Sequence, residues 1–186
     1  ISPVSSDTKI IERSRNSFCL VILGKVAMIG IREATKEDYH FIHRLQKQVH
    51  EIHCKGKPDH YQMADITLDR SYYESLFDDE HSRIFVVEVD GKIVAYAIVK
   101  IKEPDPRPIL VPKTVAYVRD FGVDQDYRRK GIGRMLFNYL VDFAKNFGAN
   151  VLELDVWEFN KEAFRFYEEM GMETVTRKME RKLQSR

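Results

Sequence analysis

The sequence is poor in cysteine, in net charge and in long apolar runs, and each shortage excludes a class of protein. Cys19 and Cys54 are its only cysteines, too few for a disulfide framework, and neither has a spacing typical of a zinc site. This favours an intracellular, cytoplasmic protein. Thirty basic residues balance twenty-nine acidic ones, which argues against a nucleic-acid partner. The apolar run at residues 18–23 is too short to cross a bilayer, so no membrane partner is expected.

Two common phosphate-binding motifs are also missing. The sequence has no G-x-x-x-x-G-K-[ST] and no G-x-G-x-x-G after a predicted strand, which excludes a P-loop and a dinucleotide fingerprint. His50, His53 and Cys54 lie close together, but no carboxylate or further ligand joins them at helical spacing. A histidine-rich surface helix is the simpler interpretation, and no metal is expected.

What the sequence does contain is a basic, glycine-containing turn, V-D-Q-D-Y-R-R-K-G-I-G, at residues 123–133. A hydrophobic strand ends at Val123, and a helix opens directly after the turn. Backbone N–H donors, a positive helix end and cationic side chains therefore meet at one point, which is typical of a phosphate site. The candidate binding residues are Arg128, Arg129, Lys130, Gly131, Ile132, Gly133 and Arg134. A solvated basic turn before an amphipathic helix is the alternative interpretation of this stretch alone.

The helix after the turn is predicted from one continuous apolar stripe with helical spacing. Gly148 follows it as a candidate C′ residue, with Lys145 in the last turn. The stripe consists of Ile132, Met135, Leu136, Tyr139, Leu140, Phe143 and Phe147.

Two motifs resemble those of the GNAT superfamily of acetyl-CoA-dependent N-acetyltransferases. Residues 128–133, R-R-K-G-I-G, are similar to the family's pyrophosphate loop, Q/R-x-x-G-x-G/A. Residues 154–172, L-D-V-W-E-F-N-K-E-A-F-R-F-Y-E-E-M-G-M, resemble its strand–Asn–helix–Tyr segment. Members that acetylate ribosomal-protein N-termini carry a closely similar L-E-V-x-x-x-N run. The resemblance covers residues 29–183, and the two motifs in order are far more specific than either alone.

The rest of the chain agrees with the fold that this resemblance implies, an α/β acyl-CoA N-acyltransferase fold. Its central sheet would be mixed and largely antiparallel, with helices on both faces. A capping box at Thr35 and Asp38 predicts the start of the first helix, and Asp90-Gly91 predicts a hairpin. Four prolines predict a loop over residues 103–112. Strands are predicted at 29–32, 83–89, 92–101, 115–123, 150–157 and 173–183, and further helices at 68–76, 132–147 and 161–170.

Residues 1–27 form a segment of different character. They are polar up to Ser17, then apolar, and Met28 directly precedes the first predicted strand. We therefore predict an N-terminal extension at 1–27, outside the catalytic fold, and an N-acetyltransferase domain at 28–186. The sequence leaves open whether the extension is native.

The resemblance also implies where the co-substrate binds. In the family, the strand ending at Val123 and the strand containing Leu154 splay apart, and the pantetheine arm lies in the gap. Main-chain groups of Phe121 and Val123, with Gly122 between them, would then pair with the pantetheine amides. The Val123 N–H would bind the thioester carbonyl and its oxyanion. Asn160 would cap the next helix and contact the cofactor arm.

Catalytic roles follow from the same resemblance. Tyr167 matches the tyrosine that protonates the departing thiolate, although a tyrosine at that spacing is also an ordinary core residue. Asp155 lies where related N-terminal acetyltransferases carry a glutamate base. Other members place the base on the preceding strand, where this sequence has Tyr117. Asp120 is the nearest acid there, and it lies off the strand's parity unless a bulge resets it.

The expected activity is direct acetyl transfer from acetyl-CoA, as co-substrate, to a primary amine without a covalent intermediate. The acceptor is either a protein or peptide N-terminus or a small-molecule amine. A non-catalytic acyl-CoA-binding sensor is the alternative from another class. Acceptor specificity would reside in residues 55–66 and 103–113, which match no motif. Family members are frequently homodimers, and the sequence leaves the oligomeric state open.

Overall fold

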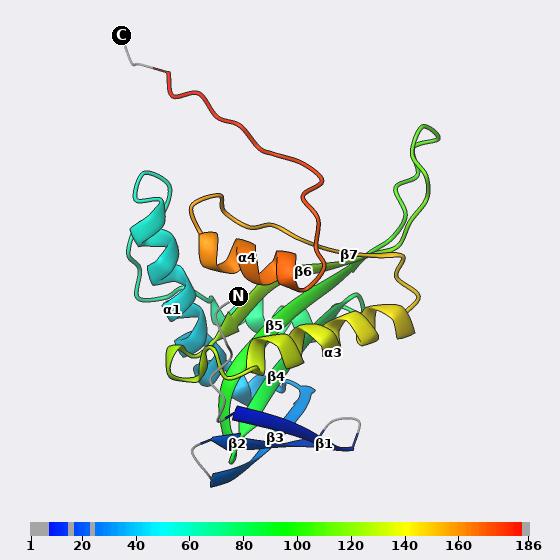
Figure 1. Ribbon diagram of the computed structural model, residues 1–186. Coiled ribbons are helices and arrows are strands. Elements are labelled where there is room, and N and C mark those ends of the chain that lie inside the picture. Colours follow the sequence, from blue (N-terminus) through cyan, green and yellow to red (C-terminus); the bar gives the residue numbers. More distant parts are fainter. Residues whose placement is uncertain (1–7, 15–16, 23–24, 184–186) are drawn as a thin grey trace. The chain divides into compact units, whose positions relative to one another are not determined.

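The computed structural model describes residues 8–14, 17–22 and 25–183, and the chain divides into two compact units, Ile1–Asp155 and Val156–Arg186. Figure 1 shows their helices and strands. The second unit contains α4 (Lys161–Glu169). The first unit contains β1 (Thr8–Ser14), β2 (Ser17–Ile22), β3 (Lys25–Glu33), η1 (Lys36–Asp38), α1 (Tyr39–Gly56), α2 (Arg70–Asp78), β4 (Ser82–Val89), β5 (Lys92–Lys102), β6 (Val115–Val123), η2 (Gln125–Tyr127), α3 (Ile132–Asn146) and β7 (Val151–Leu154).

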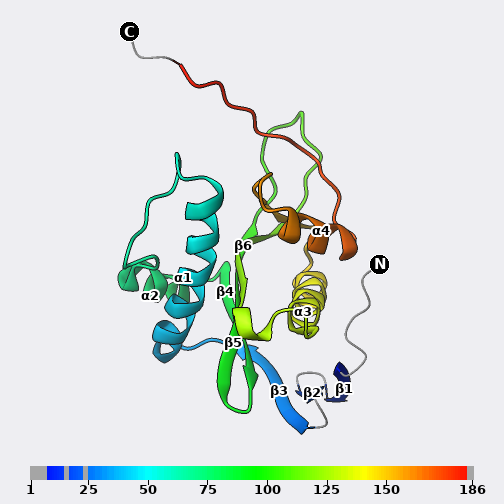
Figure 2. The same ribbon diagram turned by 60° about the vertical axis from the view of Figure 1, so that its left-hand side comes forward.

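The described strands form one seven-stranded sheet in chain order, β1-β2-β3-β4-β5-β6-β7. Every neighbouring pair is antiparallel except β6 and β7, which are parallel. Helices α1 and α2 cover one face of the sheet, and α3 covers the other (Figure 2). The prediction of a mixed, largely antiparallel sheet with helices on both faces is confirmed.

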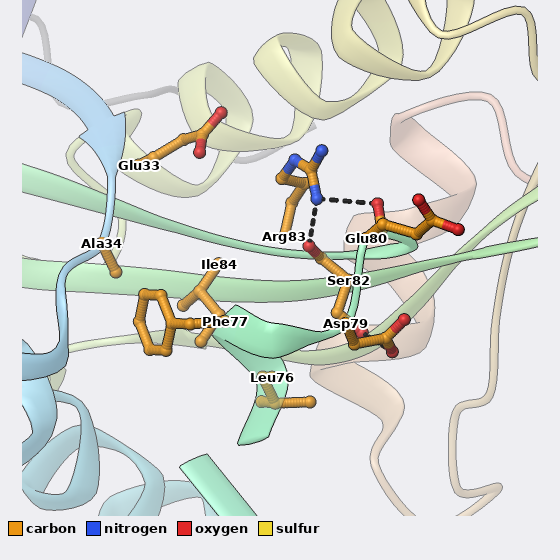
Figure 3. Close-up of a pocket in the computed structure, with 9 residues that line it drawn as sticks. All are labelled: Glu33, Ala34, Leu76, Phe77, Asp79, Glu80, Ser82, Arg83 and Ile84. Carbon is orange, nitrogen blue, oxygen red and sulfur yellow. Dashed lines mark hydrogen bonds between the residues drawn. The ribbon is translucent and has the colours of Figure 1, made fainter. Parts of the chain in front are cut away.

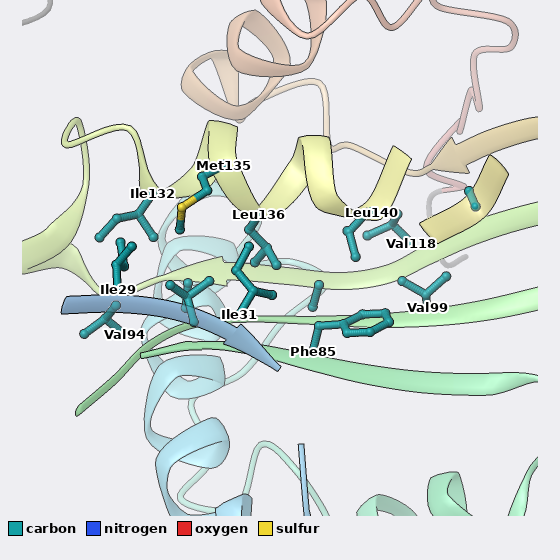
Figure 4. Packing of buried hydrophobic residues seen from close by; sticks show 14 of the residues in the cluster. Ile29, Ile31, Phe85, Val94, Val99, Val118, Ile132, Met135, Leu136 and Leu140 are labelled. Carbon is teal, nitrogen blue, oxygen red and sulfur yellow. The ribbon is translucent and has the colours of Figure 1, made fainter. Parts of the chain in front are cut away.

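Alternating side chains build a separate core on each face of the sheet. On β4, Phe85 and Val87 pack toward α3, whereas Ile84 and Val86 pack toward α1 and α2. Figure 4 shows the first core, in which Ile132, Leu136 and Leu140 of α3 lie over the strands. The predicted apolar stripe of α3 is confirmed, except that Phe147, just beyond the helix end, is exposed.

Turn, capping and proline signals in the sequence correctly indicated where several helices and strands begin or end. Asp90 and Gly91 both have positive φ, 49° and 78°, as the tight turn between β4 and β5 requires. The Asp38 carboxylate accepts the Thr35 N–H at 2.8 Å, which is one half of the predicted capping box. The segment between β5 and β6 is a loop without regular structure, in agreement with its prolines.

The predicted strand at residues 173–183 is wrong. This segment belongs to no strand, and its apolar residues Val175, Met179 and Leu183 are exposed. Alternating polarity makes a strand only where a neighbouring chain satisfies the backbone groups, and this segment pairs with none of the described strands. The strand predicted at 150–157 is also shorter, Val151–Leu154, because its parallel pairing with β6 ends at Val118.

The sheet continues before Met28. β2 pairs with β3 from Ser17↔Gly30 to Ile22↔Lys25, and β1 pairs with β2. Residues 1–7, 15–16 and 23–24 of the predicted extension lie outside the described residues. That the catalytic domain begins at Met28 stays a prediction.

Candidate functional site

A β-bulge in β6 decides which side chains face α1 and α2. The register runs from Ile98↔Asp120 to Val99↔Val118, so Arg119 is an extra residue in β6. As a result, two consecutive side chains turn to the same face. Arg119 lies over the Tyr72 ring of α2, and Asp120 accepts a hydrogen bond from Gln46 of α1.

The same bulge marks the point where β6 and β7 separate. β7 pairs with β6 only over Val115–Val118, and beyond Val118 no described strand lies on that side of β6. The Asp124 N–H donates to the Val94 carbonyl of β5, so by antiparallel alternation the main-chain groups of Phe121 and Val123 point to the open side. An extended ligand can therefore pair with β6 there as an added strand.

The turn after β6 has the backbone geometry of an anion-binding nest. Arg129 and Gly131 have positive φ, 58° and 82°, while Lys130 between them does not. Alternating backbone handedness makes successive N–H groups converge on one concavity. Gly131 is also the N-cap of α3, whose first-turn N–H groups have no carbonyl partner within the helix.

A buried carboxylate anchors this turn. Asp124 is 1% exposed, accepts the Asp126 N–H at 3.1 Å and forms a 2.6 Å salt bridge with Arg44 of α1. Burial by itself would raise the pKa of Asp124, but the Arg44 guanidinium and the Asp126 amide lower it below its ordinary value. Asp124 therefore stays ionised and joins the turn to α1.

The basic side chains of the turn first stabilise the turn itself. Arg128 Nε donates to the Val123 carbonyl at 3.0 Å, and Lys130 Nζ donates to the Asp126 carbonyl at 2.6 Å. The Tyr127 ring lies within 5.2 Å of the Lys92 ammonium and 5.1 Å of the Lys130 ammonium. Lys92 is the first residue of β5, and the pairing of β5 with β6 brings its ammonium group close to the turn. Sequence spacing gave no indication that Lys92 lies near Tyr127.

Asp120 is surrounded by polar groups, one of them from α1. Gln46 Nε2 donates to its carboxylate at 2.8 Å, and the Phe121 N–H donates at 3.0 Å. Burial raises the pKa of Asp120 above its ordinary value, against the opposing effects of Gln46, Tyr96, the Phe121 amide and His53. The residue keeps some exposed surface, but protein atoms surround its carboxyl group, and burial has the largest effect on its pKa.

Unsatisfied polar atoms lie around the same carboxylate. Gln46 Oε1 and the Tyr72 hydroxyl are buried without a hydrogen-bond partner in the part of the chain that the structure describes. Buried polar atoms in native proteins ordinarily have a partner, either protein, water or ligand. A water molecule or an amine bound beside Asp120 would satisfy these atoms.

The predicted base Asp155 has a different environment. It is exposed at the end of β7, and its carboxylate accepts the Tyr117 hydroxyl at 2.7 Å. Burial and this hydrogen bond raise the pKa of Tyr117 to about 12. The two alternative base positions that the sequence indicated, 117 and 155, thus form one hydrogen-bonded pair.

Asn160 and Tyr167 belong to the second unit. Asn160 Oδ1 accepts the Ala163 N–H at 3.2 Å, so its predicted capping of α4 is confirmed. Tyr167 lies two helical turns further along α4. Their approach to the co-substrate stays a prediction.

Two open pockets lie on the face covered by α1 and α2, and both include residues of α2. The first, of about 420 Å³, is lined by the end of β3, the end of α2 and the start of β4, where Arg83 donates to the carbonyls of Glu80 and Ser82 (Figure 3). The second, of about 530 Å³, lies between α2 and the strands β5 and β6. Neither contains a residue of the turn after β6. The second includes Tyr117 and Arg119, which places it beside the β6 bulge.

Among the described residues, no helix has the length and hydropathy needed to span a membrane, and no group of three or more His, Cys, Asp or Glu side chains is arranged for a metal.

Comparisons with known proteins agree with this geometry. The model of the acetyltransferase (GNAT) family matches residues 46–172. The chain is 33% identical over 104 residues to an uncharacterized N-acetyltransferase of Methanocaldococcus jannaschii, covering 56% of this chain and 45% of the relative. It is 30% identical over 92 residues to a [ribosomal protein bS18]-alanine N-acetyltransferase of Escherichia coli, covering 50% and 55%. The chain thus spans about half the length of these curated relatives.

Solved structures share the fold over nearly their whole length. The tetramutant of the BH1408 protein from Bacillus halodurans is 35% identical, with a TM-score of 0.79, and the match covers 82% of this chain and 99% of that one. A metagenomic aminoglycoside acetyltransferase, at 22% identity and a TM-score of 0.64, shows likeness of fold alone.

Proposed function

Because this chain belongs to the acetyltransferase (GNAT) family, we propose that it transfers the acetyl group of acetyl-CoA directly to a primary amine. The observation that carries this proposal is the edge of β6 beyond Val118, where no described strand pairs with it and which leads into a nest-shaped turn at the N-terminus of α3. This arrangement suits an extended amide-containing arm joined to a pyrophosphate.

The residues of β6 and the turn have distinct roles in this proposal. In this proposal the Phe121 carbonyl accepts a hydrogen bond from a pantetheine amide, because the Phe121 N–H already donates to Asp120 and the Val123 carbonyl accepts from Arg128. The Val123 N–H stabilises the developing oxyanion. The amides of the turn, from Arg128 to Arg134, bind the pyrophosphate. Arg128 and Lys130 keep the turn in its binding shape through their carbonyl contacts. Gly122 allows β6 to pass close to the Tyr96 ring, since an added Cβ would lie 2.5 Å from Tyr96 Cε1.

The chemistry is nucleophilic attack by the amine on the thioester carbonyl. A carbon–nitrogen bond forms, the carbon–sulfur bond breaks, and the products are an N-acetyl amine and free CoA. Tyr167 donates a proton to the leaving thiolate, since a phenol with a reference pKa of about 10 is protonated at neutral pH. Proximity and oxyanion stabilisation supply most of the rate, and acid–base catalysis adds roughly two to four powers of ten.

For the base, the geometry favours Asp120 over Asp155. A better base has a pKa closer to the working pH, and burial raises the pKa of Asp120. Asp155 is exposed and already accepts the Tyr117 hydroxyl. Asp120 removes the ammonium proton through a water molecule that also bonds Gln46 Oε1. Asp155 then orients Tyr117 beside the acceptor.

An acceptor screen tests the activity. Purified protein is incubated with acetyl-CoA and two panels, peptides with free N-termini and small amines, while free thiol is measured. Acceptor-dependent thiol release with N-acetyl product identified by mass spectrometry supports the enzyme. Tight CoA binding by calorimetry without release from any acceptor would instead support the acyl-CoA sensor.

A further inference from the structure

The pocket between α2 and the strands β5 and β6 is lined by three cations and one carboxylate, and the Asp155 carboxylate lies beside it on the Tyr117 hydroxyl. The residues that matter for the argument are Tyr72, Asp79, Lys100, Lys102, Tyr117 and Arg119. Lys100 is neutralised by its salt bridge with Asp79, whose pKa is lowered chiefly by the hydrogen bond from Lys100. Lys102 and Arg119 have no salt bridge with any carboxylate of the described residues.

Both of these cations lie against tyrosine rings. The Lys102 ammonium is 3.4 Å from the Tyr117 ring centroid, and the Arg119 guanidinium carbon is 4.9 Å from that of Tyr72. Such contacts hold a cation in place without neutralising its charge. The N–H donors of Lys102 and Arg119 therefore remain available to a ligand that enters the pocket.

The pocket also adjoins the proposed base. Arg119 and Asp120 are consecutive residues that the bulge turns to the same face, with Cα atoms about 3.8 Å apart. Burial raises the pKa of Tyr72, while the charges of Arg119 and Asp120 act on it in opposite directions. One molecule can therefore place an anionic group at Arg119 and an amine near Asp120.

We propose that the acceptor is a primary amine that also carries a carboxylate, which Arg119 and Lys102 bind in this pocket. The inference rests on the proposed acetyl transfer. A guanidinium offers paired N–H donors that match a carboxylate, and the Lys102 ammonium adds a second charge. The same charges repel polycationic acceptors such as polyamines. The carboxylate belongs either to an acidic residue near a peptide N-terminus or to a free amino acid.

Pairs of acceptors that differ by one charge test this inference. They also distinguish the two possible sources of the carboxylate, a peptide and a free amino acid. The peptide arm compares peptides with aspartate or asparagine at the second position. The small-molecule arm compares an amino acid with its amide, and a polyamine serves as cationic reference. We expect kcat/KM to favour the acidic member of one pair by about ten- to a hundredfold, as for a hydrogen-bonded charge. The preference shrinks as salt concentration rises.

Variants connect the preference to the pocket. Arg119→Gln and Lys102→Gln should each reduce the charge preference severalfold while leaving CoA affinity unchanged. Lys145→Gln, in the last turn of α3 on the other face of the sheet, removes an exposed cation and should leave both properties unchanged. Thermal unfolding of each variant verifies that it folds. If Arg119→Gln does not fold, the charge preference of Lys102→Gln alone tests the inference.

The outcomes separate this inference from the function on which it rests. Turnover of neutral or cationic acceptors at least as fast as acidic ones, unchanged in Arg119→Gln and Lys102→Gln, overturns the carboxylate inference and leaves the acetyltransferase in place. Absence of thiol release from every acceptor, with CoA still bound, overturns the proposed function and this inference with it.

Discussion

At the scale of single residues, the insertion of Arg119 into β6 has the largest consequence for function. By simple strand alternation, Asp120 would point to the α3 face. The bulge resets the parity, so that Asp120 contacts Gln46 and Arg119 lies over Tyr72 on the face of α1 and α2. Bulges often re-aim side chains in this way beside active sites.

The first prediction separates Asp120 from Asp155. We expect Asp120→Asn to lower kcat/KM by about a hundredfold, because the amine loses its proton acceptor. In the parent, kcat/KM falls as pH drops through the pKa of Asp120, which burial raises above that of an ordinary aspartate. In Asp155→Asn, kcat/KM should still fall at low pH as in the parent, so the acidic limb of its pH profile is retained. pH profiles of both variants check the assignment, and loss of the limb in Asp155→Asn alone would return the role of base to Asp155.

Stability gives an independent readout of the same substitution. A carboxyl whose pKa is raised in the folded state destabilises the fold when it is ionised. Its penalty therefore grows as pH rises from the reference value of about 3.9 through the folded pKa. Asp120→Asn should raise the thermal midpoint at neutral pH, with a smaller gain at acid pH. A lower midpoint at neutral pH would show that Asp120 contributes to the fold through its hydrogen bonds.

The second prediction concerns Tyr167. Replacement by phenylalanine keeps the ring and removes only the hydroxyl, so packing on α4 is retained. We expect kcat to fall by roughly ten- to a thousandfold, because the leaving thiolate loses its proton donor. CoA affinity by calorimetry should be nearly unchanged. Parent-like kcat in Tyr167→Phe would make this residue part of the core instead.

At the scale of elements, sequence signals worked where local chemistry determines the structure. The Asp90-Gly91 turn, the apolar stripe of α3 and the basic turn before it all follow from neighbouring residues. The bulge at Arg119 does not, because only pairing with β5 defines it. The positions of Lys92 near Tyr127 and of Gln46 near Asp120 likewise depend on which strands and helices pack together. Sequence thus predicted the turn after β6 and the helix that follows it, and it missed the side chains that β5 and α1 bring to Tyr127 and Asp120.

The third prediction tests the turn as a unit. Gly131→Val puts a side chain where φ is 82° and where we propose that the backbone contacts pyrophosphate, so we expect CoA binding to be lost. Gly148→Val is the matched control, because Gly148 has φ 83° and nothing lies within 4 Å of an added Cβ. Both should lose stability through backbone strain, but only the first should lose CoA affinity in calorimetry. Parent-like affinity in a folded Gly131→Val protein would disprove the loop assignment.

At the scale of the whole molecule, the sheet extends beyond the family-like domain that the sequence predicted. β1 and β2 continue it past β3, which the resemblance had placed first. The resemblance contained no signal for them, because it began at residue 29. Conversely, the predicted strand at 173–183 has the right alternation and no strand partner among the described residues. Pairing across a sheet is a property of the assembled chain, so sequence patterns alone do not define where the sheet ends.

The last prediction is that a protein starting at Met28 folds and binds CoA. Such a truncation removes β1, β2 and the first residues of β3. The pairing of β3 with β4, from Ile29↔Val89 to Glu33↔Phe85, is retained. The core on the α3 face keeps Ile29 and Ile31. The lost β2–β3 hydrogen bonds can be replaced by water at the new edge, so their net cost is small, about 1 kcal/mol for each. We expect CoA affinity within twofold of the full chain and a modest drop in thermal midpoint. Loss of folding or of CoA binding would show that β1 and β2 belong to the catalytic domain, with the boundary before Met28.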